Sequence, residues 1–161
     1  MTNPEQTPYS AYVHLLIRLH ELIVQHLGEG PEADALRDEA DLHWRSLTPQ
    51  QIKRVRGLSE DLHSIREHLP EPIPHNNLSK QILHTWDLGD WDGVLSLVRH
   101  NPVWLRPYWI ALLRSGCYEK LGDPEAAAVF KREAARLLGT IAGSFSITIP
   151  TAATLANDKE F

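Results

Sequence analysis

This sequence of 161 residues has a single cysteine, no excess of basic residues and no long apolar run. The single cysteine, Cys117, excludes an internal disulfide framework and any zinc site built from several thiolates, so a reducing cytosol is the expected compartment. The formal net charge is −5, and residues 1–77 hold 12 Asp and Glu against 7 Lys and Arg. A general nucleic-acid binder needs a concentrated basic face, so this composition argues against one.

Neither a membrane span nor a secretory signal is indicated. The most apolar stretch, residues 9–27, still contains His14, Arg18, His20 and Glu21, which favours a buried helix over a transmembrane one. The first seven residues are polar and contain no Lys or Arg, so they do not match a signal peptide. We therefore expect a soluble cytoplasmic protein.

The motifs of common catalytic sites are also missing. The sequence contains no Gly-rich phosphate loop and no serine in a nucleophile-elbow pattern. Cys117 falls in the middle of an apolar helical stretch, where a free thiol behaves as a small hydrophobic residue. We therefore expect no enzyme activity, no catalytic residue and no cofactor.

Three helices are expected in residues 1–69. The first runs from Thr7-Pro8 to Gly28, because a capping threonine precedes a proline at the first helical position. Gly30-Pro31 opens the second, and Thr48-Pro49-Gln50-Gln51, which matches a capping box, opens the third. The expected inward residues are Tyr12, Leu15, Leu16, Leu19, Leu22, Ile23 and Leu27 in the first helix, Ala33, Leu36, Ala40, His43, Trp44 and Leu47 in the second, and Ile52, Val55, Leu58, Leu62, Ile65 and Leu69 in the third.

Prolines divide the chain after these helices. Pro70, Pro72 and Pro74 predict a linker over residues 70–77, because proline lacks the amide donor that a helix needs. Four further helices follow, joined so closely that they must fold back as hairpins: Leu78–Leu88, Trp91–His100, Pro107–Leu121 and Pro124–Leu138. Their expected inward residues are Leu78, Ile82 and Trp86, then Trp91, Val94 and Val98, then Trp109, Leu112, Leu113 and Gly116, then Ala127, Phe130, Ala134 and Leu137.

The last residues, 139–161, have a different pattern. Phe145, Ile147 and Ile149 alternate with polar residues, which predicts an extended or disordered tail. The expected fold is all-α, with a three-helix N-terminal bundle over residues 1–69 packed on two helical hairpins over residues 78–138.

Two short segments repeat at an offset of 33 residues: Leu88-Gly89-Asp90-Trp91-Asp92 recurs in outline as Leu121-Gly122-Asp123-Pro124-Glu125. Tyr118, Gly122, Ala127 and Ala134 lie at the spacing of aromatic and small packing residues in the tetratricopeptide repeat, so residues 105–138 resemble that family. The resemblance implies stacked hairpins with a concave groove that binds peptides or proteins, and it implies no catalytic group.

The expected function is therefore that of a protein–protein interaction or scaffold module that holds a peptide or protein segment in a short helical groove. In tetratricopeptide-like stacks the first helix of each hairpin lines the concave side. The residues expected to face a partner there are Lys80, His84, Tyr108, Arg114 and Ser115, with Trp104 at the rim. The neighbouring Trp86, Trp91 and Trp109 are expected in the core.

Two alternatives remain open at this point. One is a helical-bundle metal-binding protein or metalloenzyme that uses Glu39, His43 and nearby histidines, because these two residues lie one helical turn apart. Glu60 and His63 have a ligand spacing too, but they fall on the side of their helix that faces solvent. The other alternative is a purely structural domain of a larger assembly.

Overall fold

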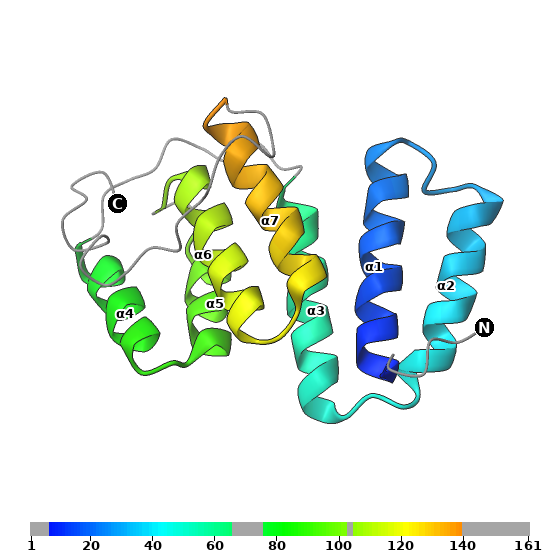
Figure 1. The fold of residues 1–161 in the computed structure, drawn as a ribbon, viewed down its shortest axis with the longest axis horizontal. Helices are drawn as coiled ribbons and strands as arrows, with labels where there is room; N and C mark the ends of the chain where they lie inside the picture. Colours follow the sequence, from blue (N-terminus) through cyan, green and yellow to red (C-terminus); the bar gives the residue numbers. More distant parts are fainter. Residues whose placement is uncertain (1–6, 66–75, 103–104, 140–161) are drawn as a thin grey trace. The chain divides into compact units, whose positions relative to one another are not determined.

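The computed structural model describes residues 7–65, 76–102 and 105–139. These residues form seven α-helices and no β-strand, which confirms the expected all-α class. The chain divides into two compact units at residue 66, and Figure 1 shows the helices of each. No helix in the described ranges has both the length and the apolar character needed to span a membrane.

The first unit contains α1 (Pro8–Val24), α2 (Pro31–Trp44) and α3 (Pro49–Ser64). α1 lies between the other two helices, and it packs extensively on α2 but more sparsely on α3 (Figure 1). The chain reverses direction between α1 and α2 and again between α2 and α3, so α1 and α3 run in the same direction.

Two of the expected helix starts are formed by side-chain caps. The hydroxyl of Thr7 accepts a hydrogen bond from the Ser10 amide at 3.1 Å and caps α1. At the start of α3, the Thr48 hydroxyl accepts from the Gln51 amide at 3.3 Å, and the Gln51 side chain accepts from the Thr48 amide at 2.9 Å. The predicted capping box is confirmed, because each side chain satisfies an amide that the helix leaves without a partner.

The end of α1 differs from the expectation. The helix stops at Val24 rather than at Gly28, because His26 takes a left-handed backbone conformation with φ of 63°. The Leu27 amide then donates to the Leu22 carbonyl at 2.8 Å, which closes the turn. This end of the helix leaves Val24 and Leu27 about half exposed, at 50% and 53%.

α1 has four distinct faces around its axis. Ala11, Leu15 and Leu22 are buried on one face, Val13 and Ile17 are buried on a second, and a third is polar and largely exposed. The fourth is a stripe of half-buried apolar side chains at positions i, i+4, i+7 and i+11, namely Tyr12, Leu16, Leu19 and Ile23. α1 therefore carries more apolar surface than its neighbours cover.

The second unit contains α4 (Asn76–Asp87), α5 (Trp91–His100), α6 (Pro107–Lys120) and α7 (Pro124–Leu137). Each helix packs on the next in sequence, most extensively α6 on α7. Figure 1 shows α4 with α5 and α6 with α7 as antiparallel hairpins. α4 begins at Asn76, so the last two residues expected in the linker are helical.

The repeated sequence forms the same turn twice. Gly89 and Gly122 both have positive φ, 71° and 81°, and in each case the glycine amide bonds three residues back while the following aspartate amide bonds five residues back. The four bonds join Gly89 to Trp86 at 2.9 Å, Asp90 to Thr85 at 3.2 Å, Gly122 to Glu119 at 3.2 Å and Asp123 to Tyr118 at 2.9 Å. This is the Schellman arrangement, which ends a helix at a glycine.

The core of the second unit follows the predicted inward faces closely. Most of the expected residues are buried: Leu78, Ile82, Trp86, Val94, Val98, Trp109, Leu112, Leu113, Gly116, Ala127, Phe130 and Ala134. Tyr118 stacks on Phe130 with ring centroids 5.5 Å apart. Leu137 is an exception, since it lies 36% exposed in the last turn of α7. The tail expected over residues 139–161 lies outside the described residues, apart from Gly139.

Candidate functional site

The expected partner-facing surface of the hairpins is only partly present. Lys80 and His84 are exposed on α4, one turn apart, as the helical spacing predicted. Tyr108 is half-buried at the start of α6, where its ring lies 5.8 Å from that of Trp109. Trp104 lies outside the described residues.

The expectation that Arg114 and Ser115 face a partner is wrong. They are only 4% and 5% exposed, because α6 packs between α5 and α7 and every residue from 109 to 118 is buried. The Ser115 hydroxyl donates a hydrogen bond to the Ala127 carbonyl of α7 at 3.1 Å. The guanidinium carbon of Arg114 lies 5.6 Å from the centroid of the Phe130 ring, also on α7. Both side chains therefore act in packing α6 against α7.

Three tryptophans have the packing role that the sequence indicated, namely Trp86, Trp91 and Trp109. Trp86 and Trp109 are buried, and the half-buried Trp91 meets Trp86 edge to face with ring centroids 5.2 Å apart. Cys117 is fully buried, as expected for a small hydrophobic residue.

The residues considered for a metal site do not converge in the described part of the chain. Glu39 is exposed and His43 is half-buried on α2, and no group of three or more His, Cys, Asp or Glu side chains within residues 7–65, 76–102 and 105–139 is arranged to hold an ion. A metal centre needs at least three converging ligands of this kind, which a single pair on one helix does not supply.

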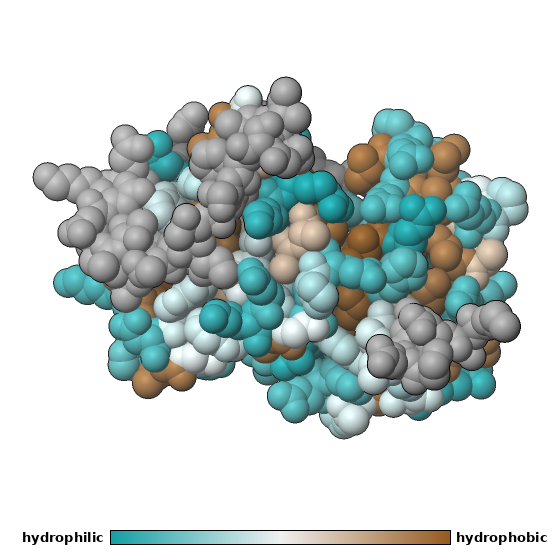
Figure 2. Space-filling view, viewed as in Figure 1, coloured by the Kyte–Doolittle hydropathy of each residue, from teal (hydrophilic) through white to brown (hydrophobic). Residues whose placement is uncertain are grey.

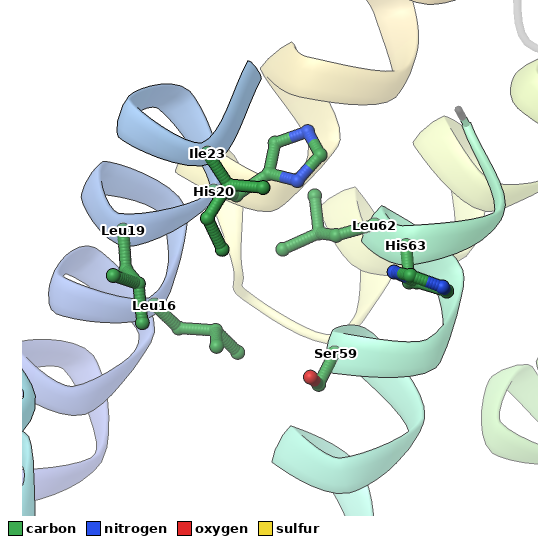
Figure 3. A pocket seen from close by; sticks show the side chains of 7 residues that line it. All are labelled: Leu16, Leu19, His20, Ile23, Ser59, Leu62 and His63. Atoms are coloured by element: carbon green, nitrogen blue, oxygen red, sulfur yellow. The ribbon is translucent and has the colours of Figure 1, made fainter. Parts of the chain in front are cut away.

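A pocket of about 110 Å³ lies in the first unit, between α1 and α3. It is lined by Leu16, Leu19, His20 and Ile23 of α1 and by Ser59, Leu62 and His63 of α3. In Figure 3 the Leu16 and Leu62 side chains point toward the opposite helix, and the imidazoles of His20 and His63 border the space from the two sides. Its floor is apolar and its polar groups lie at the edge.

The loose packing of α1 on α3 explains why this pocket exists. Three of its apolar residues, Leu16, Leu19 and Ile23, belong to the half-buried stripe of α1. On α3, the pocket residues Ser59 and His63 belong to a second stripe with the same spacing, formed by Ile52, Arg56, Ser59 and His63. We call the space between these two stripes the α1–α3 groove. Ser59 is short, so this stripe does not fill the space opposite the leucines.

Side chains from all three helices meet at the end of the α1–α3 groove where α1 and α3 begin. The rings of Tyr12 and Trp44 lie 5.5 Å apart, and the guanidinium carbon of Arg56 lies 5.7 Å from the Trp44 centroid. Arg56 is exposed although it covers the Trp44 ring. The contact with the ring positions the guanidinium, and its charge still faces solvent. Burial, with a smaller contribution from the negative charge of Asp41, raises the pKa of Tyr12 above its ordinary value.

Sequence reasoning missed this groove because it placed Tyr12, Leu16, Leu19 and Ile23 in the core together with the buried leucines of α1. A signal was nevertheless present, since the apolar positions of α1 spread over about two thirds of its circumference, which is wider than the single stripe of a helix that faces a core. On the face of this unit shown in Figure 2, apolar residues also lie among hydrophilic ones over the α1–α2 pair.

No protein-family model matches the sequence, and neither a curated protein nor a solved structure matches the chain.

Proposed function

We propose that this chain is a protein–protein interaction module, and that its α1–α3 groove receives an apolar side chain from a partner helix. The observation that carries this proposal is the partly open apolar pocket formed by Leu16, Leu19, Ile23 and Leu62. Apolar side chains held half-exposed in a concave site gain free energy when a partner removes them from water. The proposed binding surface therefore lies on the first unit rather than on the hairpins.

The size and shape of the pocket suit a side chain better than a larger ligand. An apolar cavity of about 150 Å³ accommodates a benzene molecule, so 110 Å³ admits a branched aliphatic side chain such as that of leucine. An amphipathic helix lying along the groove would place its apolar residues at the i, i+3 or i+4, and i+7 positions against the α1 stripe. The pocket is lined mainly by apolar side chains, so binding is the chemistry it supports best.

The experiment is a selection of helical peptides displayed on phage against the full chain, followed by binding measurements on two variants. Ser59→Phe places a ring in the pocket that Ser59 lines. Glu60→Phe adds the same ring at the next residue of α3, which is exposed and does not line the pocket.

We expect selected peptides to share one leucine-sized residue whose replacement by alanine abolishes binding. Ser59→Phe should weaken their binding at least about tenfold, which corresponds to about 1.4 kcal/mol, while Glu60→Phe leaves it within about twofold. Circular dichroism checks that both variants keep their helices. Peptides that bind the Ser59→Phe variant as tightly as the original chain would overturn the proposal.

A further inference from the structure

The two walls of the α1–α3 groove differ in chemistry. The α1 stripe, Tyr12, Leu16, Leu19 and Ile23, has no charged residue. The α3 stripe, Ile52, Arg56, Ser59 and His63, contains a permanent cation, a hydroxyl and an imidazole, and His20 adds a second imidazole from α1. Neither stripe contains an aspartate or a glutamate, although the unit as a whole is acidic.

Arg56 dominates the charge along this groove. Arg56 belongs to the α3 stripe, seven residues before His63 on the same helical face, and it stays exposed while its guanidinium lies over Trp44. Lys53 and Glu60, the charged residues one turn before and after Arg56 on α3, lie to the outer side of this stripe and have opposite signs, so together they add no net charge beside it. At the end of the groove, Asp41 lies close enough to Tyr12 for its negative charge to contribute to the raised pKa of Tyr12.

We infer that the partner is an acidic amphipathic helix, and this inference rests on the proposed function of the groove. Its apolar residues lie against the α1 stripe, and its carboxylates lie over Arg56, Ser59 and the histidines. Charge complementarity of this kind sets the orientation of a bound helix and excludes basic competitors more than it adds affinity. The Ser59 hydroxyl can also donate a hydrogen bond to a carboxylate oxygen.

The test uses two synthetic peptides with a fluorescent label and the full-length chain. Both carry leucines at the i, i+4 and i+7 positions of an alanine-rich helix, and they differ only in having glutamates or lysines beside the leucines. Fluorescence anisotropy at low salt gives both dissociation constants. The acidic peptide should bind at least about fivefold more tightly, and the difference should shrink as salt is added.

Two charge-reversal variants show whether the preference arises locally. Arg56→Glu should weaken the acidic peptide about fivefold or more and strengthen the basic one. Arg132→Glu makes the same change of net charge at an exposed position of α7 in the other unit, and it should leave both constants within about twofold.

The outcomes separate the inference from the proposed function. Equal binding of both peptides, or tighter binding of the basic one, overturns the inference of an acidic partner. If that binding still depends on the leucines, it supports the proposed function of the groove. If neither peptide binds, the inference fails. The proposed function is then tested only by the selection of helical peptides displayed on phage. A dimer in light scattering that Ser59→Phe abolishes would identify a second copy of the chain as the occupant and overturn the acidic partner.

Discussion

Ser115 and Ala127 join α6 to α7 through a hydrogen bond of 3.1 Å from the Ser115 hydroxyl to the Ala127 carbonyl. Both residues are buried, so neither group can exchange this bond for one with water. Ser115→Ala removes the donor and should lower the free energy of unfolding by about 1 kcal/mol. Urea denaturation measures this change. If Ser115→Ala leaves stability unchanged but weakens peptide binding, the residue acts at a partner surface after all.

His26 ends α1 in a left-handed conformation that glycine adopts more easily. We expect His26→Gly to raise the free energy of unfolding by about 1 kcal/mol, because the strain of the side chain is relieved. The reciprocal change is Gly122→Ala, at a position with φ of 81° where an added Cβ meets no other atom within 4 Å. It should lower stability by a similar amount through backbone strain alone. Thermal unfolding of the two variants checks both signs, and a loss of stability in His26→Gly would contradict the argument.

Thr48 caps the start of α3, the helix that supplies Ser59, Leu62 and His63 to the pocket. Thr48→Ala removes one half of the capping box and should cost about 1 kcal/mol of stability. Thr48→Asp keeps an oxygen that can accept from the Gln51 amide, so it serves as the control and should stay within about 0.5 kcal/mol of the original chain. Equal losses in the two variants would show that the cap contributes little.

The raised pKa of Tyr12 makes the chain sensitive to alkaline pH. Burial, followed by the charge of Asp41, disfavours the phenolate in the folded state. Above pH 10, near the ordinary pKa of tyrosine, the unfolded chain ionises before the folded one, so this contribution to stability is lost as pH rises through the folded pKa. Tyr12→Phe removes the effect. Urea titrations at pH 8 and pH 11 should show a smaller loss for the variant, and identical losses would rule out this role.

The helices were predictable because their signals are local. Thr7 with Pro8, Thr48 with Gln51, and the Gly-Asp pairs at 89 and 122 each specify an end through bonds within a few residues, and the structure forms all of them. The end of α1 was placed too late, because a left-handed histidine has no sequence signal comparable to that of glycine.

The binding surface was less predictable because exposure depends on which helices meet. Arg114 and Ser115 fall opposite the apolar stripe of an isolated α6, yet α6 packs against helices on both sides and both residues are buried. The reverse holds for Leu16 and Leu19, which have the periodicity of core residues but line a pocket, because α3 packs only loosely on α1. Periodicity gives the faces of a helix and leaves open how many neighbours cover them.

The order of contacts in the second unit sets how it exchanges its amide hydrogens with solvent. α4 packs mainly on α5, whereas α6 lies between α5 and α7 and is buried over ten consecutive residues. An array in which each helix depends on its sequence neighbour opens from its weaker end. The amides of α4 therefore exchange first through partial opening, and those of α6 exchange only when the whole unit unfolds.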